Sequence, residues 1–365
     1  MRVVVRPEGT EDTSFRAVLA RVVTGAPLTA DEAEAAFGLI MDGHVSESQI
    51  AGFLMALRMR GESPDELLGA VKAVRARMKA LENPPADAID VCGTGGDGHG
   101  TLNVSTAVSF VLAALDVPVA KHGNRALSSK SGASDVLGAL GVPLKDDVAT
   151  LGADLRDRRL AFLAAPNHHP AMRHAAAVRR ALGVRTLFNL IGPLANPARV
   201  THQLVGVPDV RWLAPIVDTL AKLGSQRVWA VCGELDEEAD GFVDEVTLAG
   251  PTRIEALENG QRYQLVLEPE MAGFQRAPIS AIAGGGPVEN AAALNALLRG
   301  SRGAYRDTVL LNAACAMHVA GRGEAVQAGA IHPTALLELV GMAAQAIDGG
   351  DALAVLERAR EGSVQ

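Results

Sequence analysis

The chain has 365 residues, of which 48% are hydrophobic and only 3% aromatic. That length and apolar content suffice for a buried core and favour two domains, and the shortage of rings predicts a core of closely packed aliphatic side chains. The formal charge is 34 − 42 = −8. It argues against binding to nucleic acid or to an acidic membrane, because affinity for phosphate backbones needs a basic face.

The cysteines and the N-terminus bear on the compartment. Cys92, Cys232 and Cys315 have no metal-ligand spacing and stand among apolar neighbours, which predicts buried, reduced thiols. The residues before Pro7 lack the apolar core of a secretory signal, and no run of about 18 apolar residues could span a bilayer. The sequence therefore predicts a soluble, cytoplasmic protein.

The first predicted elements are helices over residues 13–82, after a polar extension at 1–12. A capping box supports each of three helix starts, because the first hydroxyl can accept from the third backbone amide while the later side chain reaches back. The pairs are Thr29 with Glu32, Ser46 with Gln49, and Ser63 with Glu66. We expect a small helical domain with a face for self-association.

The break at Asn83-Pro84-Pro85 separates this domain, 13–82, from a second one at 86–365. After it, short apolar runs alternate with Ala-rich helical runs, which is typical of a mostly parallel α/β sheet flanked by helices. Strands are predicted at 88–91, 117–120, 160–164, 204–207, 228–232 and 263–267, and helices at 104–115, at 133–140 and over nearly all of the chain after 288.

A glycine-rich loop lies between the first strand and its helix. Its glycines are Gly93, Gly95, Gly96, Gly98 and Gly100. Glycines let a backbone come close to a ligand and expose its amides. Because a helix N-terminus carries partial positive charge and unpaired N–H groups, phosphate is the expected ligand. A tight turn without a ligand is the alternative.

The spacing of Gly93, Gly95 and Gly98 also matches the dinucleotide fingerprint G-x-G-x-x-G. That fingerprint opens its helix directly and has an acidic residue at the end of the next strand. Here residues 99–101 intervene, and Lys121 stands where the acid should be. A Walker loop fails for want of Gly-Lys-Ser/Thr.

A second polar loop, residues 121–132, follows the next predicted strand and holds three cations and three hydroxyls. Lys supplies point charges and Arg a planar fork, both suited to phosphate. A solvated basic loop is the alternative, but two such loops at consecutive strand ends face the same ligand crevice of an α/β sheet. Together the loops favour a polyphosphate ligand.

Two later segments add candidates for an organic anion and a cation. Residues 166–197 mix cations with small apolar residues, as in a pocket for an organic anion. His168 and His169 lack a third zinc ligand, and Arg179 and Arg180 fit either this pocket or an exposed helix face. The acidic run 234–245 reads as a solvated loop except at its end. Asp244-Glu245 follows an apolar pair and suits Mg²⁺, which prefers oxygen ligands.

These segments together resemble the anthranilate phosphoribosyltransferase family, whose fold is also that of pyrimidine nucleoside phosphorylases. The resemblance runs from about Phe15 to the C-terminus. It rests on Gly93–Asp97, Asn103–Thr106, Lys121–Ser129, His169–Met172 with Arg179, Phe188–Pro197 and Asp244-Glu245.

The resemblance implies a reaction: anthranilate and phosphoribosyl pyrophosphate give N-(5-phosphoribosyl)anthranilate and pyrophosphate, in tryptophan biosynthesis. It also implies Mg²⁺ and a homodimer joined through the helical domain. No general base is assigned, because an aromatic amine is neutral near pH 7 and needs orientation more than deprotonation.

It further implies roles for individual residues. Phosphoribosyl pyrophosphate is expected to contact Gly93, Gly96, Asp97, Thr101, Asn103, Val104, Ser105, Thr106, Lys121, His122, Gly123, Asn124, Arg125, Ala126, Leu127, Ser128, Ser129 and Ala133. Anthranilate is expected to contact Gly93, His122, Asn124, His169 and Arg179. Ser105, Asp244 and Glu245 are the expected magnesium ligands.

Two departures from the family pattern fall within the expected site, and the extension 1–12 and the segment 328–333 are additional to that pattern. Ala133 replaces a common Ser, and the stretch before Asp244 is longer than usual. Two rival classes share the fold. A nucleoside phosphorylase is disfavoured by the segment from His169 to Arg179, and a nucleic-acid-binding relative by the charge of −8 and the intact acid pair.

Overall fold

The computed structural model describes residues 10–125, 130–235 and 241–362. The chain forms two compact units. The smaller, here the helical unit, comprises residues 1–79 and 169–195, and the larger, the sheet unit, comprises 80–168 and 196–365. The division into domains 13–82 and 86–365 stays a prediction. That division assigns residues 169–195 to the second domain, whereas in the structure they pack with the N-terminal helices.

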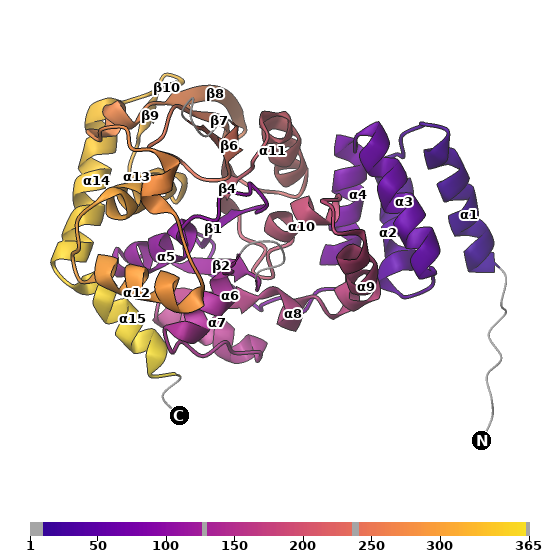
Figure 1. Cartoon of the computed structure of the whole chain (residues 1–365), viewed down its shortest axis with the longest axis horizontal. Helices are drawn as coiled ribbons and strands as arrows, with labels where there is room; N and C mark the ends of the chain where they lie inside the picture. Colours follow the sequence, from indigo (N-terminus) through magenta and orange to yellow (C-terminus); the bar gives the residue numbers. More distant parts are fainter. Residues whose placement is uncertain (1–9, 126–129, 236–240, 363–365) are drawn as a thin grey trace. The chain divides into compact units, whose positions relative to one another are not determined.

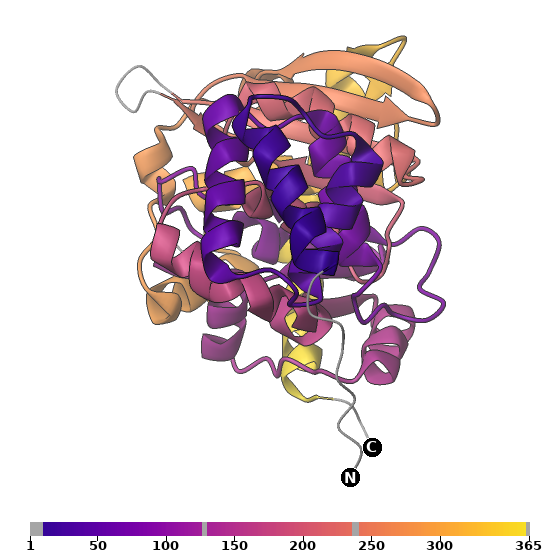
Figure 2. The same ribbon diagram turned by 90° about the vertical axis from the view of Figure 1, so that its right-hand side faces the viewer.

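Four helices begin the helical unit and lie side by side in Figure 2, in indigo and violet. They are α1 (Thr10–Val23), α2 (Ala30–Met41), α3 (Glu47–Arg60) and α4 (Pro64–Arg75). The later segment adds the 3₁₀ turn η1 (Pro170–Met172), α9 (Arg173–Leu182) and α10 (Phe188–Leu194). All three predicted capping boxes are confirmed. Helix α1 begins at Thr10, so the predicted extension is wrong for residues 10–12.

A series of aromatic rings explains why the later segment joins this unit. Phe53 contacts Phe15 and Phe37 edge to face, and Phe37 in turn contacts Phe188 of α10 at 5.5 Å between ring centroids. Edge-to-face pairs are worth about 0.5–1.5 kcal/mol beyond the area they bury. In a chain with so few rings, this cluster is a specific anchor for α10.

The sheet unit is built on one mixed sheet. Its strand order is β3-β2-β1-β4-β5-β7-β8, with β6 pairing with the end of β5. The neighbours from β3 to β5 are parallel, and β6, β7 and β8 are antiparallel. The strands are β1 (Ile89–Gly93), β2 (Val119–Gly123), β3 (Leu160–Ala164), β4 (His202–Gly206), β5 (Arg227–Glu234), β6 (Phe242–Val243), β7 (Thr252–Glu258) and β8 (Gln261–Leu267).

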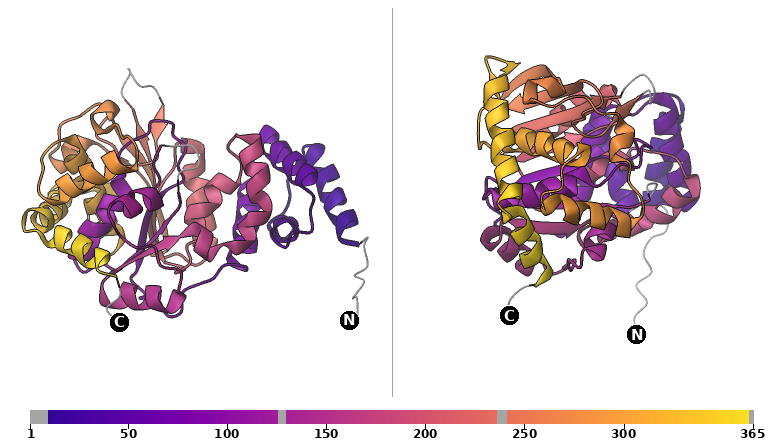
Figure 3. Two further views of the ribbon diagram at one scale, coloured as in Figure 1. Left: turned by 60° about the horizontal axis from the view of Figure 1, so that its bottom comes forward. Right: turned by 60° about the vertical axis from the view of Figure 1, so that its left-hand side comes forward.

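Helices cover the sheet. The helices are α5 (Val104–Ala114), α6 (Ala133–Ala139), α7 (Val148–Asp157), α8 (Ala165–His168), α11 (Leu213–Lys222), α12 (Pro287–Leu298), α13 (Ala304–Val319), α14 (Pro333–Asp348) and α15 (Asp351–Arg360). Four of them, α5, α13, α14 and α15, pack together, and Figures 1 and 3 show α14 and α15 in yellow. Short 3₁₀ turns, η2 (Val210–Trp212), η3 (Pro269–Ala272) and η4 (Ile279–Ile282), and the hairpin β9 (Val326–Gln327) with β10 (Ala330–Ile331) complete the unit.

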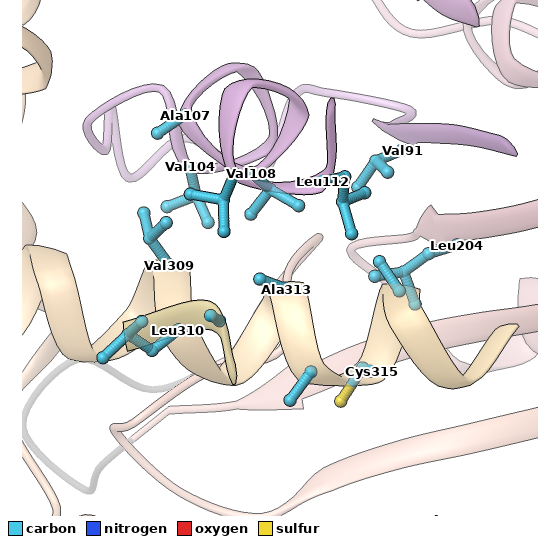
Figure 4. Packing of buried hydrophobic residues seen from close by; sticks show 14 of the residues in the cluster. Val91, Val104, Ala107, Val108, Leu112, Leu204, Val309, Leu310, Ala313 and Cys315 are labelled. Atoms are coloured by element: carbon cyan, nitrogen blue, oxygen red, sulfur yellow. The ribbon is translucent and has the colours of Figure 1, made fainter. Parts of the chain in front are cut away.

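The core of this unit centres on α5 and α13, which are buried on nearly all sides. Figure 4 shows Val104, Val108 and Leu112 of α5 facing Val309 and Ala313 of α13, all of them buried. A helix buried all round offers its N-terminus as a fixed point, because any shift would open cavities that cost about 2–5 kcal/mol for a lost Leu-sized group.

The fold class predicted from sequence is confirmed: helices come first, then a mainly parallel sheet flanked by helices. The six predicted strands occur within a few residues of their expected ends. The sequence pattern missed β7, because most residues on both faces of this strand are buried and polar and apolar residues do not alternate along it. It also missed the hairpin β9–β10. Among the described residues no single helix is long and apolar enough to cross a membrane, and only α14 and α15 taken together, with a bend of 56° between them, meet that test.

Candidate active site

The site is set by the order of the parallel strands. From β1 the chain goes to β2 and β3 on one side and then returns to β4 on the other side of β1. The carboxyl ends of β1 and β4, Gly93 and Gly206, are paired directly. Ligands of open α/β sheets bind at such a topological switch point, where the loops after two neighbouring strands diverge.

The glycine loop leaves β1 at this point. Gly95, Gly96, Gly98 and Gly100 all have positive φ, between 60° and 86°, a backbone conformation that side chains disfavour. The loop is fixed at both ends: the amide of Thr94 donates to the carbonyl of Gly206, and Leu102 donates to Ile282. The predicted phosphate loop is therefore a defined turn that leaves the sheet at the switch point.

The acid pair lies against the same two strand ends. After β5 the chain turns back through β6, which brings Asp244 beside Gly93 and Gly206. A Cβ atom at Gly206 would lie 1.7 Å from the Asp244 carbonyl oxygen, and one at Gly93 would lie 2.2 Å from its carboxylate. The amide of Gly95 donates to the Asp244 carboxylate at 2.6 Å. The acid pair and the glycine loop, far apart in sequence, thus form one structure.

Glu245 lies near the first turn of α5, where the backbone of Ser105 favours the ionised form of its carboxyl group. Burial, with repulsion from Asp244, raises the pKa of Glu245 to about 8. Lys121 opposes this rise, and the charge of Asp97 adds to it. Three carboxylates therefore share one small region whose negative charge is only partly balanced.

This donor set fits a magnesium ion. Across the described part of the chain, no group of three or more His, Cys, Asp or Glu side chains is arranged to hold a metal by itself. Asp244 and Glu245 could hold part of a coordination shell of hard oxygens, with the remaining ligands coming from elsewhere. Mg²⁺ is usually bound in this way, through one or two carboxylates plus substrate phosphates and water. A cation would also relieve the repulsion that raises the Glu245 pKa.

Lys121 is the buried cation beneath the loop. Its Nζ donates to the Val91 carbonyl at 2.7 Å and to the Ser105 hydroxyl at 3.1 Å, and the residue is 3% exposed. Asp90, the nearby acid, is fully buried and accepts from the His122 amide and the Asn196 side chain. Burial raises the Asp90 pKa, and the charge of Lys121 opposes that rise. The buried ammonium group of Lys121 is thus held by hydrogen bonds, which a charge inside a protein requires.

The second predicted loop follows β2, next to β1 in the sheet. Its Asn124 carbonyl accepts from the Ser134 amide at the start of α6, and its side chain accepts from the Arg125 amide. Ala133 lies close to Gly123, 3.2 Å from where a Cβ there would stand. The predicted contacts at 126–129 lie outside the described residues. Among the described residues, both loops begin at the carboxyl ends of two neighbouring parallel strands, β1 and β2.

Two predicted anthranilate residues, His169 and Arg179, belong to the helical unit. The guanidinium of Arg179 stacks on the Phe188 ring at 5.3 Å, and burial lowers the Arg179 pKa. Arg180, its neighbour, is exposed. The structure therefore decides what the sequence left open: Arg179 is held against an aromatic ring, whereas Arg180 faces solvent. Their roles stay predictions, as do those of Gly93, His122 and Asn124 in the sheet unit.

Sequence reasoning missed several residues that hold this site. Gly206 has no side chain and so leaves room for the acid pair. Val246 follows the pair, and Asn312 of α13 accepts from its amide and donates to its carbonyl. Asn290 and Tyr305 hold Asn103 at the start of α5. Gly206, Asn290 and Asn312 lie in mainly apolar stretches, and Tyr305, although it stands beside Arg306 and Asp307, belongs to no ligand motif. Composition alone therefore gives no signal.

The fold and the site together define a class of protein. A family described as glycosyl transferase family, a/b domain, matches residues 85–344, and its helical bundle domain matches residues 16–78. The chain is thus a two-domain glycosyl transferase. More narrowly, it belongs to the anthranilate phosphoribosyltransferase family.

Individual relatives support that assignment. The anthranilate phosphoribosyltransferase of Gluconobacter oxydans is 59% identical over 351 residues, which is 96% of each chain. That of Methylocella silvestris is 50% identical over 96% of this chain and 95% of its own. Both alignments cover nearly the whole length, so the assignment rests on both units.

Solved structures agree. The Thermus thermophilus enzyme is 39% identical with a TM-score of 0.82, covering 94% of this chain and 98% of its own. The Saccharomyces cerevisiae enzyme, solved in complex with PRPP and Mg, is 26% identical with a TM-score of 0.83 over 96% and 98%. A variant of the yeast enzyme, 25% identical with a TM-score of 0.82 over 97% and 98%, was solved in complex with 4-fluoroanthranilate.

Proposed function

We propose that this chain transfers the 5-phosphoribosyl group of phosphoribosyl pyrophosphate to the amine of anthranilate and releases pyrophosphate. The observation that carries the proposal is the acid pair seated on the glycine loop at the switch point of the sheet. The alternatives for the glycine loop, a simple turn or a dinucleotide-binding loop, give no reason for two carboxylates at this position.

The chemistry of the transfer suits these groups. As the anomeric bond breaks, pyrophosphate gathers negative charge and the ribose ring becomes cation-like. The amides of Gly96, Gly98 and Gly100 and the partial positive charge at the start of α5 are proposed to stabilise that leaving charge. The amides of Thr94 and Gly95 are not part of this set, because they donate to Gly206 and Asp244. Magnesium, when bound at Asp244 and Glu245, supplies Lewis-acid stabilisation of phosphate oxygens. Because that charge develops during the reaction, such fixed donors lower the barrier more than they strengthen substrate binding.

Lys121 is proposed to support the diphosphate site from within the protein. Because it holds the Ser105 hydroxyl and the Val91 carbonyl, it fixes the first turn of α5 and adds positive charge beneath the diphosphate. Arg125, Ser128 and Ser129 are proposed to contact phosphate from the second loop. Phosphoribosyl pyrophosphate contacts at Gly96, Asp97, Thr101, Val104, Thr106 and Gly123 complete the proposed set.

The experiment is a direct assay of the purified protein with phosphoribosyl pyrophosphate, Mg²⁺ and anthranilate, following the loss of anthranilate fluorescence. We expect turnover that stops on addition of EDTA and returns with excess Mg²⁺. Phosphorolysis of a pyrimidine nucleoside with inorganic phosphate, without anthranilate turnover, would assign the protein to the rival class instead.

Arg179 is proposed to hold the anthranilate carboxylate, and its replacement tests that role. Arg179→Ala should lower kcat/KM for anthranilate by about 10- to 100-fold, since a charge-assisted hydrogen bond is worth about 1.5–3 kcal/mol. Its exposed neighbour provides the matched control, and Arg180→Ala should change kcat/KM less than about twofold. Equal effects of the two variants would exclude the role, and Arg179→Met shows how much of the loss is packing against Phe188 alone.

The proposed function comes with an expected oligomeric state and an expected cellular location. We infer a homodimer joined through the helical unit, and exposed Met59 of α3, 81% accessible, and Val23 of α1, 66% accessible, are apolar side chains that such a contact would cover. We also infer a cytoplasmic location. The three cysteines, all within described segments, are buried and free of disulfides, which suits a reducing compartment.

A further inference from the structure

Asn103 stands at the N-cap of α5, yet its side chain makes no capping hydrogen bond. An Asn in this position normally accepts from the second or third amide of its helix. Here its Oδ1 accepts instead from Nδ2 of Asn290, at 2.9 Å. The side chain is therefore turned away from its own helix, which leaves the amides of the first turn of α5 to other acceptors.

The direction of the Asn290 amide is fixed by the backbone. The Gly285 N–H donates to Oδ1 of Asn290 at 2.7 Å, and a backbone amide can act only as a donor. Nδ2 of Asn290 must then face Asn103, and Asn103 must turn its Oδ1 toward it. Asn290 is 2% exposed, so water does not offer it an alternative partner.

Tyr305 of α13 holds the backbone of the same residue. Its hydroxyl donates to the Asn103 carbonyl at 3.1 Å, the carbonyl that also accepts the first helical bond from Ala107. Burial and the charge of Glu245 raise the Tyr305 pKa, which keeps the hydroxyl protonated and able to donate. Side chain and backbone of Asn103 are thus each held by one residue of the C-terminal helices.

We infer that Asn290 is a positioning residue for the diphosphate site: through Asn103 it presents the Nδ2 donor of that residue, and not its oxygen, to the ligand. The inference rests on the proposed function. If Asn103 turned over, an amide oxygen would face phosphate oxygens, exchanging a hydrogen bond for a repulsion. The polarity of one phosphate contact is therefore set by a backbone amide at Gly285, which acts through Asn290.

A double-mutant cycle tests this inference, because a residue that acts only through another has no effect once the other is gone. KM for phosphoribosyl pyrophosphate, KM for anthranilate and kcat are measured for Asn290→Ala, Asn103→Ala and the double variant. Asn290→Ala alone should raise KM for phosphoribosyl pyrophosphate about tenfold. In the Asn103→Ala background it should change that KM less than about twofold.

The isosteric variant Asn290→Asp keeps an acceptor for Gly285 but has no donor for Asn103. It should raise KM for phosphoribosyl pyrophosphate more than Asn290→Ala does, because Asn103 then turns its own donor toward the new carboxylate. It also keeps the test open if the alanine variant folds poorly, and melting temperature is recorded for every variant.

The outcomes separate the inference from the function on which it rests. Full anthranilate turnover by the unaltered chain, with equal effects of Asn290→Ala in both backgrounds, overturns the positioning role and leaves the function standing. So does an Asn290→Asp enzyme with unchanged KM for phosphoribosyl pyrophosphate. An unaltered chain that binds phosphoribosyl pyrophosphate in calorimetry without turning over anthranilate contradicts the function. The same cycle, measured by calorimetry, then still decides the role of Asn290.

Discussion

Replacing Glu245 with glutamine is expected to lower kcat/KM by about 100- to 1,000-fold while leaving the fold as stable as before, or more stable. The loss follows because an amide is a weak magnesium ligand and because the metal stabilises charge on the leaving pyrophosphate. The stability gain follows because burial and Asp244 raise the pKa of Glu245 to about 8, so ionising this carboxyl opposes folding in the metal-free protein.

The sign of the pH dependence follows from linkage. Between the ordinary value of 4.5 and about 8, the folded state holds a proton that the unfolded state has lost. Stability from this group therefore falls as pH rises through that window. The glutamine variant lacks the titration. With EDTA present, its melting temperature should exceed that of the unaltered chain by more at pH 8 than at pH 5.

A matched control separates this effect from a general loss of charge. Glu338 lies on α14 in the same unit and is exposed, so Glu338→Gln should leave both kcat/KM and the melting temperature nearly unchanged. If Glu245→Gln retained full Mg²⁺-dependent activity, Glu245 would not be a metal ligand. A large fall in its melting temperature at pH 8 would show that the carboxylate is structural.

Adding a single methyl group at Gly206 is expected to disable the site from the strand beneath it. The new Cβ of Gly206→Ala would stand 1.7 Å from the Asp244 carbonyl oxygen and 2.3 Å from its carbonyl carbon. Both contacts are backbone, so the acid pair must move away from the glycine loop. We expect a loss of about 3 kcal/mol of unfolding free energy and a fall of about 100-fold in kcat/KM, as misplacement by about 1 Å can cause.

Gly138 gives the control for this change. It lies in α6, and among the described residues no atom other than those of its own helix backbone and chain neighbours lies within 4 Å of an added Cβ. Gly138→Ala should stabilise the protein by about 0.5–1 kcal/mol, the helix propensity difference, with activity unchanged. Urea denaturation and steady-state kinetics on both variants check the pair. Equal stabilities for Gly206→Ala and the unaltered chain would mean that the acid pair does not lie on β4 as described.

Local chemistry made much of this protein predictable from its sequence. The capping boxes at Thr29, Ser46 and Ser63 form as expected, because each depends on residues three apart in one short segment. The glycine-rich turn after β1 and the polar loop after β2 were predictable for the same reason, since strand, turn and helix follow one another directly. The residue types of the acid pair and its apolar flank indicate magnesium ligands, and that role stays a prediction.

What the sequence by itself determined, then, is the set of local elements and the chemistry of each loop. Only the tertiary structure decided which of them meet, because the strand order places β1 beside β4 and the return through β6 carries Asp244 onto their ends. The same applies to Phe188, which ties residues 169–195 to the N-terminal helices, and to Asn290, which reaches Asn103 across 187 residues. Contacts of that range depend on packing between elements, and no short-range pattern in the chain records it.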